Sequence, residues 1–284
     1  MVDFNEVSDR VWVARFPWFD VNVGLIAGSE GLVVVDTNAT PALGQDVLDA
    51  VRRISKAPLV AAVNTHLHFD HTFGNAVFVA DGAQLIAHEA AAAALPAHAA
   101  EVREAAAEDP DPRTDDLVTV EPVVPDRTFS SALSLDLGDR VLELIHPGRG
   151  HTDGDIVLRV PDADVLFAGD LVEESAARSA VPGFGSDCYP MDWPATLDLV
   201  LQLTGAGTRI VPGHGLPVDQ DFVHEQRSAL GVVAETIRDL VTRGVPEVQA
   251  LEAADWPYPR EELDNAVRRG YEQLPGVRRQ LPLI

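Results

Sequence analysis

One segment limits what this chain can fold into more than any other. The apolar run LVAAV (residues 59–63) leads directly into NTHLHFDH (residues 64–71). The run is typical of a buried strand, so its end brings three histidines and an aspartate close to the core. Burying such titratable groups without a compensating cation is costly. The segment therefore predicts a metal site at the end of a buried strand.

The spacing within this segment suggests how its ligands divide. Residues i and i+2 of a strand point the same way, so we expect His66 and His68 to face one ion. Asp70 and His71 follow where the chain turns, and they can face a second point nearby. Imidazole and carboxylate ligands without a thiolate suit Zn²⁺, Fe²⁺ or Mn²⁺.

Three further candidate ligands stand at the ends of later predicted strands. They are His151 in PGRGHTDG (residues 147–154), Asp170 in VLFAGD (residues 165–170) and His214 in VPGHG (residues 211–215). In each segment a glycine beside the candidate permits a tight turn and a close approach of the backbone.

The order of predicted elements indicates the fold class. In the first part, strands are expected at residues 11–14, 21–27, 32–35, 59–63 and 85–86, and helices at 41–54 and 89–108. In the second part, strands are expected at residues 133–137, 141–145, 156–160, 165–168 and 209–211, and helices at 193–203, 220–243 and 261–273. Strands precede helices in both parts, which predicts an α+β protein with two sheets packed together and helices outside.

The length of 284 residues favours a single domain. Residues 109–128 hold four prolines and are expected to form a loop excursion within that domain. From about residue 220 the chain is expected to form a helical C-terminal tail.

Composition excludes several classes of partner. Lys and Arg total 21 against 45 Asp and Glu, a net charge of −24 that disfavours binding to nucleic acid. No run of apolar residues is long enough for a membrane span, and the first residues lack a signal-peptide pattern, so we expect a cytoplasmic protein. The single cysteine, Cys188, excludes an intrachain disulfide. The expected partner is a small-molecule substrate.

The motifs together resemble those of the metallo-β-lactamase superfamily. His-x-His-x-Asp-His, Gly-x-Gly-His-Thr, Gly-Asp and Gly-His-Gly occur in that order between residue 11 and about residue 214. The resemblance implies a four-layer αββα sandwich with a two-metal site at one edge of the paired sheets.

The resemblance also implies a ligand set and a nucleophile. The first zinc ion would be held by His66, His68 and His151. The second would be held by Asp70, His71 and His214, with Asp170 bridging both ions. Asp70 and Asp170 are the expected catalytic carboxylates, and a hydroxide between the two ions would be the nucleophile.

Asp36 ends a predicted strand and resembles an aspartate that this family places behind a metal ligand. There it would accept a hydrogen bond from the outer nitrogen of a ligand histidine and fix the tautomer of that ring. A simple cap at the strand end is the alternative. Of the remaining histidines, His98 and His224 are expected on helices and in solvent.

Two aromatic segments are candidate substrate contacts. Phe16, Trp18 and Phe19 lie between the first two long strands, where the family often carries a hairpin over the metals. We interpret them as a flap over the substrate, with local packing under residues 109–128 as the alternative. Phe184 and Tyr189, after Asp170, would form a second wall. An apolar or acyl substrate fits such walls.

Glu173 bears on the choice of substrate. Zinc β-lactamases that carry a cysteine at the Asp170 position place a lysine three residues later, where it holds the carboxylate of the antibiotic. A glutamate at that position would repel this carboxylate, which disfavours a true β-lactamase.

The sequence as a whole predicts a binuclear zinc hydrolase of an ester, thioester, lactone or lactam bond. The alternative is a mononuclear iron persulfide dioxygenase, with iron on one of His66 and His68 together with His151 and Asp170. A binding module without catalytic activity is a third hypothesis.

Overall fold

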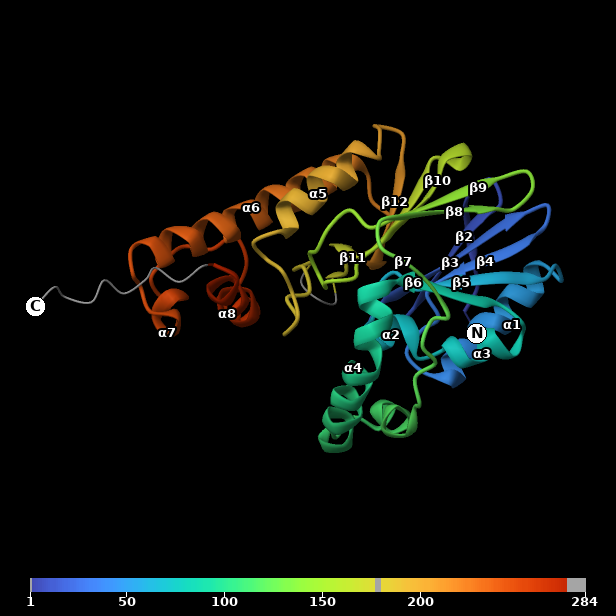
Figure 1. Cartoon of the computed structure of the whole chain (residues 1–284), viewed down its shortest axis with the longest axis horizontal. Coiled ribbons are helices and arrows are strands. Elements are labelled where there is room, and N and C mark those ends of the chain that lie inside the picture. The colour runs from blue at the N-terminus through green and yellow to red at the C-terminus, as the bar shows by residue number, and fades with distance from the viewer. Residues whose placement is uncertain (1, 177–179, 275–284) are drawn as a thin grey trace, which may run out of the picture.

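The protein folds into two sheets that pack face to face between outer layers of helices (Figure 1). The computed structural model describes residues 2–176 and 180–274. The first sheet contains β1 (Asn5–Ser8), β2 (Val11–Phe16), β3 (Val21–Gly28), β4 (Gly31–Val35), β5 (Leu59–Val63), β6 (Gln84–His88) and β7 (Arg127–Phe129). The second sheet contains β8 (Ala132–Asp136), β9 (Val141–Ile145), β10 (Val157–Val160), β11 (Val165–Glu173) and β12 (Arg209–His214).

Among the described residues, the strands of the two sheets pair with each other at one place. Strands β2, β3 and β4 are antiparallel, whereas β4 to β7 run parallel to one another. In the second sheet β8 to β11 are antiparallel, and β12 runs parallel to β11. The sheets meet where β12 pairs with β3, in a single register of His214 with Val21. The end of β12 therefore lies at the boundary between the sheets.

Three buried clusters account for the four layers. Between the sheets, Ile26, Val33 and Val63 of the first pack with Leu144 and Phe167 of the second. A second cluster joins the outer face of the first sheet to α1 (Pro41–Ile54) and α3 (Asn75–Ala80). A third joins the second sheet to α5 (Trp193–Gln202), α6 (Gln220–Thr242) and α8 (Asp264–Gln273). The predicted αββα sandwich is confirmed.

The alanine-rich helix α4 (Glu89–Glu108) projects from the first half of the molecule (Figure 1). It begins where Nδ1 of His88 accepts a hydrogen bond from the backbone N–H of Ala90 at 3.2 Å, which satisfies one of the first free donors of the helix. Residues 109–128, expected as a loop, include the 3₁₀ helix η1 (Pro112–Thr119) and the start of β7. Leu117 and Val120 of this segment are buried against Leu95 of α4. This apolar contact packs the segment onto the helix.

Other differences from the sequence prediction involve short or extended elements. β11 continues to Glu173 because its parallel pairing with β12 extends, with irregular register, as far as His214. The sequence does not predict the short elements β1, α2 (Phe69–Thr72), α3 and α7 (Glu247–Ala250). The helix predicted at residues 261–273 is divided into η4 (Arg260–Glu262) and α8. Among the described residues, no helix combines the length and the apolar character that crossing a membrane requires.

Phe16 faces the core, which does not fit its predicted contact with substrate. It is the last residue of β2, is 2% exposed and belongs to the cluster beneath α1. The alternation of side chains along the strand places Ala14 and Phe16 on the face that α1 covers, whereas Arg15 lies on the opposite face, is exposed at the strand end and pairs with Asp20.

We therefore predict that Phe16→Ala lowers the free energy of unfolding by about 3–5 kcal/mol, because it removes a buried ring and leaves a cavity. Thermal unfolding measures this loss. Val60→Ala on β5, where the side chain is 38% exposed, is the control and should change stability little. Normal stability of Phe16→Ala with altered substrate choice would restore the flap interpretation for this residue.

Candidate metal centre

All seven predicted metal ligands converge at the edge where the two sheets meet. They come from the segment after β5, from α2, from the loop before β10 and from β11 and β12. One ligand atom each from His66, His68, His151 and Asp170 lie within 4.8 Å of one another. The corresponding atoms of Asp70, His71 and His214 form a second group with the same limit.

Asp170 lies between the two groups. Its Oδ2 is 3.4 Å from Nε2 of His151 and 3.0 Å from Nε2 of His214, while its Oδ1 is 3.2 Å from Nε2 of His71. A Cβ atom at Gly213 would overlap Oδ1 of Asp170, so the glycine before His214 is what lets β12 approach this carboxylate.

The local backbone around His66 and His68 differs from the expected strand. β5 ends at Val63, His66 lies in a turn, and His68 is the residue that precedes helix α2. The two rings are nevertheless neighbours, with centroids 4.7 Å apart. The turn into α2 brings them together, and the expected alternation along a strand is wrong here.

Each of the five histidines has one ring nitrogen held outside the cluster. Two of the partners are carboxylates: Nε2 of His68 contacts Asp187 Oδ2 (3.2 Å), and Nδ1 of His71 contacts Asp36 Oδ2 (2.8 Å). Two are backbone carbonyls: Nδ1 of His151 contacts that of Gly183, and Nδ1 of His214 contacts that of Phe19, both at 2.7 Å. The fifth is a hydroxyl, since Nδ1 of His66 contacts Thr65 Oγ1 at 3.1 Å. Partners of this kind orient metal-binding imidazoles and fix their tautomers. The remaining nitrogens face the cluster.

Asp36 makes more contacts than a strand-end cap needs. Besides the contact with His71, it accepts hydrogen bonds from the backbone N–H and the hydroxyl of Thr65, both at 2.8 Å. Its φ of +64° is a left-handed conformation that non-glycine residues rarely adopt. The carboxylate thus ties together the segment that follows β5 and helix α2, at the cost of local backbone strain.

Burial and the close contacts within this cluster shift the pKa values of its members in different directions. Burial, and then the neighbouring His71, hold the pKa of His66 well below its usual value. Burial also disfavours the charged form of His71, but Asp170, Asp70 and Asp36 outweigh it and raise the pKa of His71 well above its usual value. Burial likewise opposes ionisation of Asp170, yet His214 and the other histidines hold its pKa well below the ordinary range.

The donor set fits divalent metal ions. Nε2 of His66 is buried without a hydrogen-bond partner among the described residues, although it faces Asp170 Oδ2 at 3.9 Å. A buried nitrogen lone pair with no donor is costly unless a cation accepts it. Several imidazoles and carboxylates within a few ångströms are ligands that Zn²⁺, Fe²⁺ and Mn²⁺ share.

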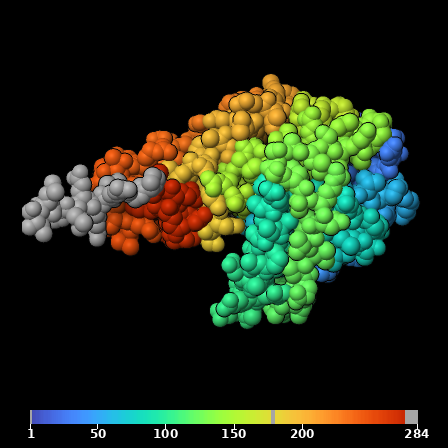
Figure 2. Space-filling model, in the orientation of Figure 1, coloured from blue at the N-terminus to red at the C-terminus, as the bar shows by residue number. Residues whose placement is uncertain are grey.

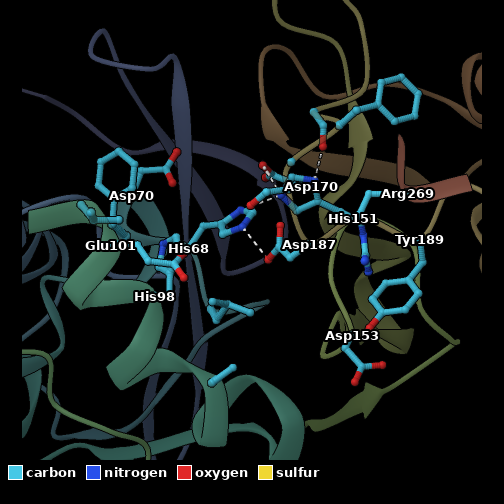
Figure 3. A pocket seen from close by; sticks show the side chains of 18 of the residues that line it. His68, Asp70, His98, Glu101, His151, Asp153, Asp170, Asp187, Tyr189 and Arg269 are labelled. Atoms are coloured by element: carbon cyan, nitrogen blue, oxygen red, sulfur yellow. Dashed lines mark hydrogen bonds and ion pairs between the residues drawn. The ribbon is translucent and has the colours of Figure 1, made fainter. Parts of the chain in front are cut away.

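A pocket of about 1040 Å³ opens over the cluster (Figure 3). His68, Asp70, His151 and Asp170 lie at its base. One wall is α4, another is the loop of residues 181–189, and Glu262 and Arg269 close the side nearest the C-terminal helices. The surface is indented between α4 and this C-terminal part of the molecule (Figure 2).

The predicted substrate contacts divide into two sets. Phe19, Phe184 and Tyr189 line the pocket. Trp18 instead packs against the cluster that contains Leu95 and Leu117, and the Arg113 guanidinium lies 5.9 Å from its ring. Trp18 therefore fits the packing alternative, under the segment that follows α4.

Glu173 does not face substrate, contrary to the sequence prediction. It is 1% exposed within β11, pairs in register with His214 and is not among the pocket-lining residues. One carboxylate oxygen of Glu173 lies within 4.8 Å of ligand atoms of Asp170 and His214. The position is buried because β11 continues beyond Asp170. A buried Glu173 cannot repel the carboxylate of a β-lactam in the pocket, so this argument against a β-lactamase no longer holds.

Sequence reasoning missed many residues of the pocket, among them His98, Asp187 and Arg269. The ring of His98 lies 4.9 Å from that of His68, and burial together with His68 lowers the pKa of His98 to about 4. Its expected exposure to solvent is wrong, whereas His224 is exposed as expected. Asp187 lies two residues before Tyr189, so a carboxylate within the predicted second wall was the available signal.

The fold and the cluster together define a metallo-hydrolase type of protein. A sequence model described as "Metallo-beta-lactamase superfamily" matches residues 16–214. This chain belongs to the metallo-β-lactamase superfamily, and its His/Asp cluster is consistent with the use of divalent metal.

Curated relatives within the superfamily have different names. A metallo-beta-lactamase type 2 from Bacillus cereus is 26% identical over 220 residues, which cover 75% of this chain and 77% of the relative. An acyl-coenzyme A thioesterase, MBLAC2, from Gallus gallus is 29% identical over 212 residues, which cover 68% and 72% respectively.

Solved structures share the fold. A metallo-beta-lactamase from Pontibacter korlensis has a TM-score of 0.64 at 24% identity and covers 81% of this chain and 99% of its own. The inverting sec-alkylsulfatase Pisa1 from Pseudomonas sp. has a TM-score of 0.77 at 18% identity. That match covers 98% of this chain but only 51% of the sulfatase chain.

We predict that Asp187→Asn weakens metal binding about 10- to 100-fold, because His68 loses the carboxylate that orients its ring. Metal content after dialysis against graded chelator measures the change. Asp153→Asn is the matched control, since Asp153 lines the same pocket but contacts no ligand histidine in the described structure. Equal metal retention by both variants would contradict a positioning role for Asp187.

Proposed function

We propose that this protein is a binuclear zinc hydrolase that cleaves an ester, thioester, lactone or lactam bond of an apolar or acyl substrate. The observation that supports it most is the pair of adjacent His/Asp groups next to a large pocket, with Asp170 close to histidines of both groups. The first ion would be held by His66, His68 and His151, the second by Asp70, His71 and His214, and Asp170 would contact both.

Two zinc ions bound there would act as Lewis acids and lower the pKa of a water molecule between them. The chain itself supplies a proton carrier. Asp70 has Oδ2 3.4 Å from Nε2 of His214 and also lines the pocket. We assign to it the proton that the attacking water releases and that the leaving group takes up when the bond to the acyl carbon breaks.

The walls of the pocket favour an acyl substrate. Leu67, Phe69 and Phe184 line it near the cluster, and the alanines of α4 continue the apolar surface away from the base. Such surface excludes water and stabilises a hydrocarbon chain. The thioesterase from Gallus gallus is named for an acyl substrate, which is consistent with this class.

Metal analysis combined with a substrate panel tests the proposal. We expect about two zinc ions per chain, and hydrolysis of at least one class among nitrophenyl esters, lactones, acyl-coenzyme A thioesters and a chromogenic cephalosporin. Asp170→Asn should lose one ion and reduce kcat/KM by at least about a hundredfold, because both groups share this carboxylate. Chelation should abolish activity and added zinc should restore it.

Two results would overturn the proposal. One iron per chain with oxygen uptake on glutathione persulfide would establish the dioxygenase alternative. Two bound zinc ions with no turnover of any panel substrate would exclude the proposed hydrolysis. Unchanged metal content in Asp170→Asn would exclude a bridging role for Asp170.

Phe19 and Trp18 should respond differently to substrate length. Phe19 lines the pocket, so Phe19→Ala should lower kcat/KM increasingly as the acyl chain lengthens, by about tenfold for long chains. Trp18→Ala should instead lower the melting temperature and act equally on short and long chains, because Trp18 packs away from the pocket. A nitrophenyl ester series measured on both variants checks this, and a length-dependent loss confined to Trp18→Ala would reverse the assignment.

A further inference from the structure

We propose that Arg269 and Tyr189 form a recognition site for a carboxylate carried by the substrate, at a distance from the bond that is cleaved. This inference rests on the proposed hydrolase function and narrows its substrate to acyl compounds with a second, negatively charged end. Both residues line the pocket, and Arg269 is its only arginine or lysine among the residues the structure describes.

Arg269 belongs to α8, beyond the part of the chain that matches the family. Its Nε donates to the Cys188 carbonyl at 3.1 Å, and its Nη1 donates to Glu272 Oε2 at 2.7 Å. The guanidinium also lies 5.2 Å from the centre of the Tyr189 ring. These contacts hold the side chain, which is 19% exposed, in one orientation before any ligand arrives.

Two donors remain for a ligand. Nη2 of Arg269 and the hydroxyl of Tyr189 make no hydrogen bond to any residue that the structure describes. Both belong to side chains in mutual contact on one wall of the pocket. A guanidinium N–H and a phenol O–H on neighbouring side chains of one pocket wall match the oxygens of a carboxylate.

The position of this wall determines where the charged end of the substrate would lie. In Figure 3, Tyr189 and Arg269 lie on the side of the pocket opposite His98 and Glu101 of α4. A substrate with its acyl carbon at the metal cluster can therefore direct a carboxylate toward α8. The donors are not metal ligands, so the site acts on substrate choice and not on metal binding.

Carboxylates near the pocket leave part of the attraction of Arg269 in place. Glu272 pairs with Nη1, but its side chain is 46% exposed, so solvent and salt screen its charge. Asp187 contacts His68 at 3.2 Å, and Asp153 lies 3.8 Å from Arg149. Glu101 and Glu262 are exposed, so solvent and salt screen their charges. Arg149, which does not line the pocket, lies 4.4 Å from the centre of the Tyr189 ring. The acidic groups disfavour a ligand with many negative charges, so a single carboxylate beside Arg269 fits better than a polyphosphate.

A matched pair of esters tests the site. Mono-4-nitrophenyl suberate and 4-nitrophenyl octanoate have acyl chains of equal length and differ in the terminal carboxylate. We expect the wild type to prefer the suberate ester, and Arg269→Gln to reduce the suberate-to-octanoate ratio of kcat/KM about tenfold. Tyr189→Phe, which removes only the hydroxyl, should reduce the ratio by a smaller factor.

Arg268→Gln is the matched control. Arg268 is the neighbouring residue on α8 and also contacts Glu272, but it donates to the Ser186 carbonyl and does not line the pocket. Its substitution should leave the ratio unchanged. If both arginine variants reduced the suberate-to-octanoate ratio equally, the change would come from disturbing helix α8 and not from losing the arginine in the pocket. That result would overturn the proposal.

Calorimetric binding separates this proposal from the reaction class. With zinc-loaded protein, suberate should bind about tenfold more tightly than octanoate, and Arg269→Gln should remove the difference. This comparison decides the role of Arg269 even if no ester is hydrolysed. Equal affinity of the wild type for suberate and octanoate, or a preference that survives in Arg269→Gln, would overturn the carboxylate site.

Discussion

The mutual attraction of buried imidazoles and carboxylates across the boundary between the two sheets is the interaction on which this structure depends. His66, His71 and their neighbours come from the first half of the chain, whereas Asp170 and His214 come from the second. The strands of the two halves pair only in the register of Val21 with His214 among the described residues. The same edge therefore joins the sheets and concentrates their charged side chains.

Orientation of the cluster is distributed over distant parts of the chain. Asp36 holds His71 from the end of β4, Asp187 holds His68 from the loop after β11, and the carbonyl of Phe19 holds His214. Phe19 has a φ of +59°, a left-handed conformation that turns the chain between β2 and β3. The aromatic segment before β3 thus contributes to the cluster through its backbone as well as to the pocket through one ring.

The sequence predicts the helices and strands whose apolar residues recur at a regular spacing, and it predicts the histidines and aspartates that can bind a metal ion. The αββα layers follow from the order of strands and helices, and the ligand candidates follow from glycine-flanked histidines and aspartates at strand ends. The inward direction of Phe16 and the burial of Glu173 could not be predicted, because they depend on where a strand ends and which face it turns to the core. Backbone acceptors such as the Gly183 carbonyl carry no signal in the sequence.

The C-terminal elements η4 and α8 give the pocket a wall that shares no residue with the metal cluster. Every candidate ligand precedes residue 215, whereas Glu262 and Arg269 reach the pocket from a later segment packed on α6 and on the loop after β11. Substitutions on this wall can change the shape and charge of the pocket without altering any group that would hold an ion. The chain thus supplies the candidate metal centre and this wall of the pocket from separate stretches of sequence, so that either can be altered by substitution while the other keeps its residues.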